Sequence, residues 1–288
     1  MTKKYATATA FRMALEERLK THSRNRGVDL QKLRTQVAFD CLLSRFFELL
    51  PNDLRLKGGY AMELRFKGSR ITKDIDLIVK EKWVRFHNDS NQNLRQVLQD
   101  AVTSKIYPDF FIFLIGTPKL NLEAPPHGGY RYPVVAQLDG RLFVQFPIDI
   151  VTTSLIIDPV EHLESKNFLK FAGIKNKPFP CISKAQQFAE KLHAYTFPRE
   201  ESDKSRVKDL IDLILLIGLE KLEKKHLKMA ITKVFEYRDT HPIPQKLDPP
   251  PANWEPKFNK LAKECGIQKN TSEAFELLSA FVRKIYHQ

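Results

Sequence analysis

Two acidic residues separated by one apolar residue are the first candidates for chemistry in this chain. They are Asp74 and Asp76, in the segment Asp74-Ile75-Asp76-Leu77. Alternate side chains of a β-strand point to the same side, so a strand here would project both carboxylates together and bury Ile75 and Leu77. Carboxylates this close repel each other unless a cation neutralises them, and oxygen-only ligands suit Mg²⁺ or Mn²⁺. We therefore predict that Asp74 and Asp76 hold divalent metal ions that bind phosphate groups.

A glycine pair and a third acid extend this candidate site. Gly58-Gly59 follows a short apolar segment and precedes a predicted helix, where glycines let a phosphate chain approach the backbone amides closely. Asp149 lies within the apolar run Phe146 to Val151, and a buried carboxylate needs a partner. Asp149 is therefore the candidate for a third metal ligand or a catalytic base.

The elements that must position these residues follow from hydrophobic periodicity and turn signals. Asp139-Gly140 is a strong hairpin signal, and Ser183 with Gln186 three residues on is a capping box that predicts a helix start. The predicted helices cover residues 7–24, 30–50, 60–66, 184–196, 205–219, 254–265 and 271–286, and the predicted strands cover residues 54–57, 75–79, 110–115, 132–137 and 141–146.

This pattern predicts an α+β protein with two domains, because strands concentrate between residues 54 and 157 and helices dominate the rest. Residues 1–165 would form a domain with a mixed sheet and N-terminal helices. Residues 166–288 would form an all-helical domain that completes the active-site cleft.

Composition limits the classes of protein to which this chain can belong. Its 288 residues, 42% of them hydrophobic, suffice for a substantial core. The formal net charge is +13, and residues 1–50 carry ten Lys and Arg against five Asp and Glu, which favours association with nucleic acid or nucleotides. The apolar stretches are too short to span a membrane, the three cysteines are widely spaced, and the N-terminus lacks a secretory signal. We therefore expect a cytoplasmic protein with free thiols and no membrane contact.

The order of these motifs resembles that of a known superfamily. A Gly-Gly pair, a short helix, an Asp-x-Asp and a later strand aspartate are typical of the DNA polymerase β-like nucleotidyltransferases. Within that superfamily the sequence resembles the AbiEii/AbiGii abortive-infection toxins and their MenT-type relatives, which are nucleotidyltransferases paired with antitoxins. The resembling stretches are Lys57 to Arg65, Arg70 to Leu77, Glu190 to Ala194, Arg206 to Leu213 and His241 to Trp254.

This resemblance implies a fold and an activity. The fold would be a polymerase-β-like nucleotidyltransferase domain with a helical domain after it. The activity would be metal-dependent transfer of a nucleoside monophosphate from an NTP to an acceptor, with release of pyrophosphate. The expected acceptor is RNA such as the tRNA 3′ end, and the expected protein partner is a cognate antitoxin.

The resemblance also implies further site residues. A lysine in the family's helical domain is inferred to contact the nucleotide phosphates, and it corresponds to Lys191. The family's required acid corresponds to Asp209 or Asp212, of which we favour Asp209 because it directly follows the Arg-x-Lys. Thr72 falls where MenT-type relatives carry a phosphorylatable Ser or Thr. With Gly58 and Gly59, the candidates for nucleotide binding are Lys57, Arg70, Thr72 and Asp212.

Other interpretations of the same residues remain open at this point. Lys191 could be an ordinary surface lysine, and Asp212 could simply pair with Lys208 at i, i+4. The enzyme could modify protein side chains in place of RNA. Alternatively, the chain could be a non-catalytic nucleotide or nucleic-acid binding module on the same fold. The clustered acids argue against that alternative, because a binding module in a basic protein does not need them.

Overall fold

The structure is a computed structural model that describes residues 4–66, 68, 70–80, 91–118, 120–122, 128–153, 155–198, 206–219 and 222–286. The chain divides into two compact units, each built from segments that are far apart in the sequence. The sheet unit comprises Met1–Leu64, Ile71–Ser154 and His162–Cys181. The helical unit comprises Arg65–Arg70, Leu155–Glu161 and Ile182–Gln288.

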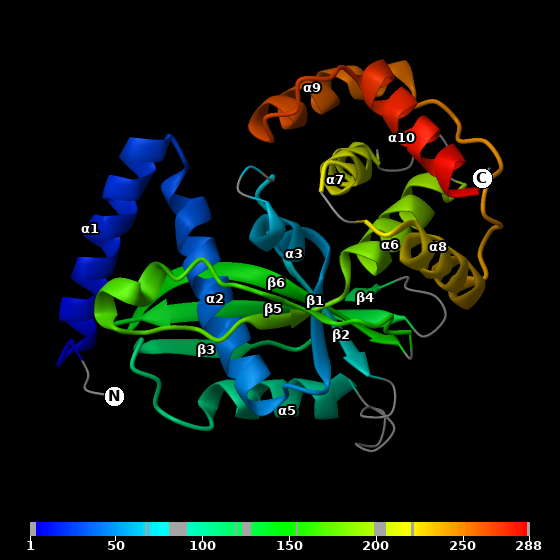
Figure 1. The fold of residues 1–288 in the computed structure, drawn as a ribbon. Helices are drawn as coiled ribbons and strands as arrows, with labels where there is room; N and C mark the ends of the chain where they lie inside the picture. The colour runs from blue at the N-terminus through cyan, green and yellow to red at the C-terminus, as the bar shows by residue number, and fades with distance from the viewer. Residues whose placement is uncertain are drawn as a thin grey trace. The chain divides into compact units, whose positions relative to one another are not determined.

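A mixed β-sheet forms the centre of the sheet unit (Figure 1). Its strands are β1 Leu54–Lys57, β2 Ile75–Lys80, β3 Phe111–Ile115, β4 Leu120–Leu122, β5 Gly129–Leu138, β6 Arg141–Thr153, β7 Glu161–Leu163 and β8 Phe179–Cys181. The order of the strands is β3-β5-β6-β2-β1-β8-β7, and β4 pairs with β5. β2 pairs antiparallel with β1 and parallel with β6, and β6 pairs antiparallel with β5. These four central strands position the acidic residues.

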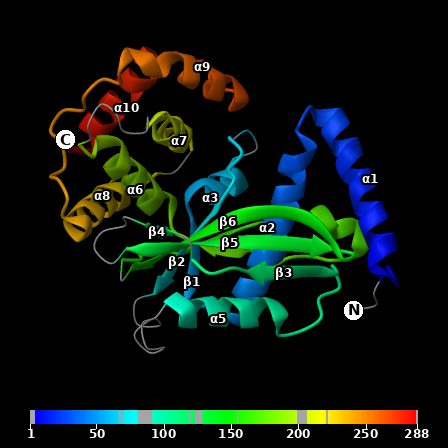
Figure 2. The ribbon, with the colours of Figure 1, turned by 180° about the vertical axis from the view of Figure 1, so that it is seen from behind.

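Helices of the sheet unit pack against this sheet and against one another. They are α1 Ala8–Arg26, α2 Leu30–Leu49, α3 Gly58–Arg65 and α5 Asn91–Thr103, with the 3₁₀ segment Phe168–Ala172. α2 begins after Asp29, whose side chain accepts a hydrogen bond from the Lys32 amide. It passes in front of the sheet in Figure 1 and behind it in Figure 2, and it contacts β6 and α5. The ring of Phe39 on α2 lies 5.0 Å from that of Tyr60 and 4.8 Å from that of Phe146, so α2, α3 and β6 share one core.

The helical unit is assembled from amphipathic helices around a buried one. They are α6 Lys184–Thr196, α7 Val207–Ile217, α8 Lys224–Arg238, α9 Glu255–Glu264 and α10 Thr271–Tyr286, with the 3₁₀ segment Ala252–Trp254. α6 begins as predicted, because the Ser183 hydroxyl accepts from the Gln186 amide at 3.1 Å. α7 contacts α6, α9 and α10, which explains why most of its residues are buried. No helix in the described ranges is long and apolar enough to cross a membrane.

The predicted α+β class, with a mixed sheet and a helical part, is confirmed. The predicted strand over 54–57 and the predicted helix over 184–196 match β1 and α6. One difference lies in the region predicted to be dominated by strands. Residues Asn91–Thr103 form α5, whose buried residues Leu94, Leu98 and Ala101 recur at helical spacing.

Candidate active site

A row of charged residues crosses four adjacent strands of the sheet unit. Lys57 on β1 is the register partner of Asp76 on β2, and Asp76 is the partner of Asp149 on β6. Asp149 is in turn the partner of Arg131 on β5. Register partners project from the same face of a sheet. The row therefore places two acids side by side on one face, between two cations.

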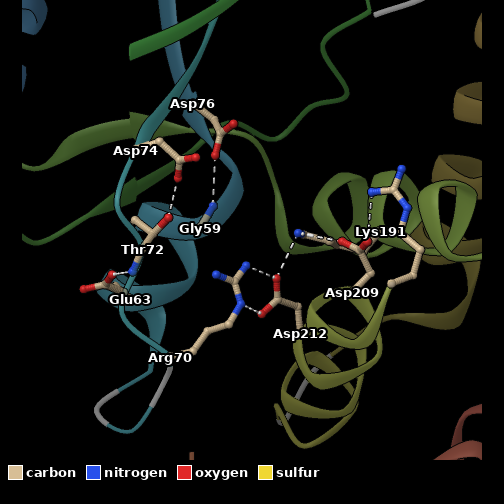
Figure 3. Close-up of polar contacts among 10 residues, drawn as sticks. Gly59, Glu63, Arg70, Thr72, Asp74, Asp76, Lys191, Asp209 and Asp212 are labelled. Atoms are coloured by element: carbon tan, nitrogen blue, oxygen red, sulfur yellow. Dashed lines mark hydrogen bonds and ion pairs between the residues drawn. The ribbon is translucent and has the colours of Figure 1, made fainter. Parts of the chain in front are cut away.

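Asp74 immediately precedes β2, which begins at Ile75. Its position two residues before Asp76 adds a third carboxylate just before the start of that strand. The predicted pair of neighbouring carboxylates is thus present, although only Asp76 lies within the strand itself. Figure 3 shows both side chains beside the start of α3.

The start of α3 holds Asp76 in place. Gly58 has φ of +63°, a left-handed conformation that favours glycine. A Cβ atom at Gly58 would lie 1.9 Å from Oδ2 of Asp76, and the Gly59 amide donates a hydrogen bond to the same oxygen at 3.2 Å (Figure 3). The glycine pair therefore brings the backbone at the start of α3 close to the carboxylate of Asp76.

Thr72 connects Asp74 to α3. Its hydroxyl donates to Oδ1 of Asp74, and its backbone amide donates to Oε1 of Glu63 (Figure 3). A Cβ atom at Gly59 would lie 2.6 Å from Oγ1 of Thr72. Thr72 is buried, so its hydroxyl is held at Asp74 by packing as well as by hydrogen bonds.

Arg131 is a member of this cluster that the sequence does not single out. Its Nε and one terminal nitrogen bind the two carboxylate oxygens of Asp149 at 2.7 and 2.6 Å, and the terminal nitrogen lies 3.9 Å from Oδ2 of Asp74. The hydrogen bonds that Arg131 donates to Asp149 raise the pKa of Arg131, and the charges of Asp149, Asp74 and Asp76 act in the same direction. A bidentate guanidinium thus offsets the repulsion among the three acids.

The donor chemistry of Asp74 and Asp76 fits a hard divalent cation, since both offer carboxylate oxygens on one side of the sheet. Asp149 is engaged by Arg131 on both oxygens. Within the described ranges, no group of three or more His, Cys, Asp or Glu side chains is arranged as a metal site. The role of Asp149 as a third ligand therefore stays a prediction.

A second polar cluster lies within the helical unit and is centred on Lys191 of α6. Its Nζ atom lies 2.9 Å from Oδ1 of Asp209 and 2.9 Å from Oδ2 of Asp212, both on α7 (Figure 3). Burial alone would lower the pKa of Lys191, but the two carboxylates outweigh burial and raise it. Lys191 is therefore a charged, partly enclosed lysine that two acids orient.

Two arginines complete the Lys191 cluster. Arg70 binds Asp212 in a bidentate pair, with nitrogen-to-oxygen distances of 3.0 and 2.8 Å (Figure 3). Arg206 lies 3.2 Å from Oδ2 of Asp209. Burial would raise the pKa of Asp209, but Lys191 and Arg206 lower it overall. The cluster contains three cations and two acids, which leaves a net positive charge when all are ionised.

The two acids of α7 differ in their surroundings. The side chain of Asp212 is 0% exposed, and both of its oxygens are bound by Arg70 or Lys191. Asp209 is 9% exposed, and one of its cation partners, Arg206, is 28% exposed. Both acids are buried, because α7 is enclosed on several sides.

The predicted site residues thus fall into two groups. One group lies in the sheet unit and comprises Lys57, Gly58, Gly59, Thr72, Asp74, Asp76 and Asp149. The other lies in the helical unit and comprises Arg70, Lys191, Asp209 and Asp212. The polar partners that were not predicted are Glu63, Arg131 and Arg206.

The chain is similar to solved structures of other proteins. The chain is similar to a structure of MenT4, a nucleotidyltransferase toxin from Mycobacterium tuberculosis H37Rv. The match covers 94% of this chain and 96% of the MenT4 chain, with 16% identity and a TM-score of 0.56. A second match is a structure of a putative nucleotidyltransferase from H. pylori. It covers 90% of this chain and 96% of the H. pylori chain, with 14% identity and a TM-score of 0.48. No curated protein sequence matches the chain.

The family assignment comes from the sequence. The family model described as nucleotidyl transferase AbiEii toxin, of a type IV toxin–antitoxin system, matches residues 41–280. That range includes every site residue named above, from Lys57 to Asp212. The chain therefore belongs to the AbiEii nucleotidyltransferase toxin family.

Proposed function

We propose that this nucleotidyltransferase transfers a nucleoside monophosphate from an NTP to an RNA acceptor, using Mg²⁺ or Mn²⁺ held by Asp74 and Asp76. The observation that carries the proposal is the row of charges across β1, β2, β6 and β5, in which Asp76 and Asp149 are adjacent on one face of the sheet, with Asp74 just before the start of β2. When bound there, a divalent ion would neutralise the phosphates and stabilise the charge that develops on the leaving oxygen.

The reaction is an in-line displacement at phosphorus. An acceptor hydroxyl oxygen forms a bond to the α-phosphorus, and the bond from that phosphorus to the bridging oxygen of the β-phosphate breaks. Pyrophosphate leaves with the electron pair, and the hydroxyl proton passes to a base, for which Asp149 is the candidate. We assign the amides of Gly58 and Gly59, and the side chains of Lys57 and Arg70, to binding of the nucleotide.

Lys191 and Asp209 are assigned supporting roles in this proposal. Lys191 carries a compact positive charge suited to phosphate, and its ammonium has three donors, two of which serve Asp209 and Asp212. Asp209 orients Lys191 and keeps it protonated. Asp212 is assigned to holding Arg70 and Lys191 in place.

The charge of the sheet unit favours RNA as the acceptor. The exposed side of α1 carries Arg18, Lys20, Arg24 and Arg26, and such a basic helix attracts a polyanion in a salt-dependent way. tRNA is therefore the first acceptor to test. We also propose that the enzyme acts in the cytoplasm. The type IV toxin–antitoxin family implies an antitoxin, whose coexpression we expect to relieve growth arrest by the toxin.

The test is incubation of the purified protein with each labelled NTP, Mg²⁺ and total tRNA. We expect label on RNA and release of pyrophosphate, with both lost in Asp74→Ala and Asp76→Ala. Asp100→Ala on α5 is the matched control, since Asp100 is exposed and its side chain accepts a hydrogen bond from its helix neighbour Gln96. Label on added protein in place of RNA, or NTP binding without turnover, would contradict the RNA proposal.

A further inference from the structure

Glu63 is a buried acid that none of the assigned roles explains. It lies on α3, and its side chain is only 1% exposed. Its Oε1 atom accepts the amide of Thr72, and its Oε2 atom accepts from Nε2 of Gln36 at 2.6 Å. Lys166 lies 3.5 Å from the same Oε2 atom. Burial raises the pKa of Glu63 overall, although the charge of Lys166 and the hydrogen bonds act to lower it.

Glu63 and Gly59 face the same segment because they are one turn apart on α3. Residues at i and i+4 of a helix lie on the same side. Gly59 makes room for the hydroxyl of Thr72, and Glu63 binds the amide of the same residue. Thr72 is therefore held against α3 at two points, and its hydroxyl is directed to Oδ1 of Asp74.

The partners of Glu63 fix it in turn. Gln36 comes from α2, and Lys166 from the segment that also donates its backbone amide to Asp40 at 3.1 Å. Asp40 accepts the hydroxyl of Tyr60 on α3 at 2.7 Å. This network ties α3 to α2, so the position of Glu63 is set by the core of the sheet unit.

We propose that Glu63 is a positioning residue for the metal-binding carboxylate Asp74, acting through Thr72. The chain of contacts is Glu63 Oε1 to the Thr72 amide, and then the Thr72 hydroxyl to Asp74. Partners of this kind behind a metal ligand change metal affinity by about 10- to 100-fold when they are removed. This inference rests on the proposed role of Asp74 as a metal ligand.

The test compares Glu63→Gln with Glu63→Met by Mn²⁺ binding, measured by electron paramagnetic resonance without NTP. Both variants remove the charge, but only glutamine retains an oxygen that can accept the Thr72 amide. We expect Glu63→Met to weaken Mn²⁺ binding about tenfold or more, and Glu63→Gln to weaken it less than about threefold. Equal Mn²⁺ affinity in both variants and the unmodified protein would overturn the inference.

A second pair of variants covers the case in which Glu63→Met does not fold. Thr72→Val removes the hydroxyl at nearly constant volume, whereas Thr72→Ser retains it. We expect Val, and not Ser, to weaken Mn²⁺ binding about tenfold. If both variants bind Mn²⁺ as the unmodified protein does, the relay through Thr72 is wrong, but the proposed function in nucleotidyl transfer is not contradicted. If Mn²⁺ binding is absent even without substitution, the metal site fails, and the inference fails with it.

Discussion

A comparison of Asp212→Asn with Asp209→Asn separates stability from catalysis in the Lys191 cluster. The side chain of Asp212 is 0% exposed and binds Arg70 through both oxygens and Lys191 through one. Asparagine keeps the shape but loses the charge, and its amide nitrogen must face a cation. Breaking a buried ion pair by removing one partner costs about 3–5 kcal/mol. We expect the free energy of unfolding to fall by that amount, which is a large share of the roughly 5–15 kcal/mol of a typical protein.

The assay is urea denaturation together with hydrogen exchange of α6 and α7. Asp209→Asn is the comparison, because its partner Arg206 is partly exposed and the lost charge is better solvated. We expect Asp209→Asn to cost less stability than Asp212→Asn but to lower kcat by roughly 100-fold, through displacement of Lys191. Glu236→Gln, on the exposed side of α8, should change neither quantity. A loss below about 1 kcal/mol for Asp212→Asn would refute the reasoning, since that is the range of exposed ion pairs.

Three further predictions concern the sheet unit. Gly58→Ala should abolish transfer and lower the Tm, because the new Cβ would meet Asp76 and because alanine is strained at the left-handed φ of this position. Retained activity in a kinetic assay would show that the conformation of the helix start is not needed. Arg131→Met should lower the Tm of the metal-free protein and enlarge the rise in Tm on adding Mn²⁺, because Asp149 loses the cation that competes with the metal. Calorimetry with and without Mn²⁺ measures both Tm values, and an unchanged rise in Tm would contradict the prediction. Burial raises the pKa of Asp40 from 3.8 to about 7, so the folded state keeps a proton that the unfolded state releases. The free energy of unfolding should therefore fall by roughly 3 kcal/mol as pH rises from 4 to 7. Urea denaturation across that range should show a flatter profile in Asp40→Asn, and identical profiles would exclude this linkage.

Local signals in the sequence are sufficient for several elements and for the residues with the most evident chemistry. The capping residue Ser183 and the apolar spacing after it predict α6 with its observed bounds. The Asp139-Gly140 turn predicts the β5–β6 hairpin. α5 is missed although the sequence carries a signal for it, because its buried residues Leu94, Leu98 and Ala101 recur at helical spacing. The acids Asp74 and Asp76 are found because their spacing is informative in combination with the glycine pair before them and the strand aspartate after them.

The partners of those acids depend on strand register, which local patterns do not supply. A two-residue turn at 139–140 pairs Leu138 with Arg141, and continuing that register without interruption would place Arg131 opposite Ile148. The register shift between Ala136 and Gln137 moves the pairing by one residue, so that Arg131 lies opposite Asp149. A single irregularity in the hairpin thus converts an apolar partner into a bidentate ion pair. The chemistry of this face is set by the bulge as much as by the acids themselves, because without it Asp149 would lie out of step with the cation that neutralises it.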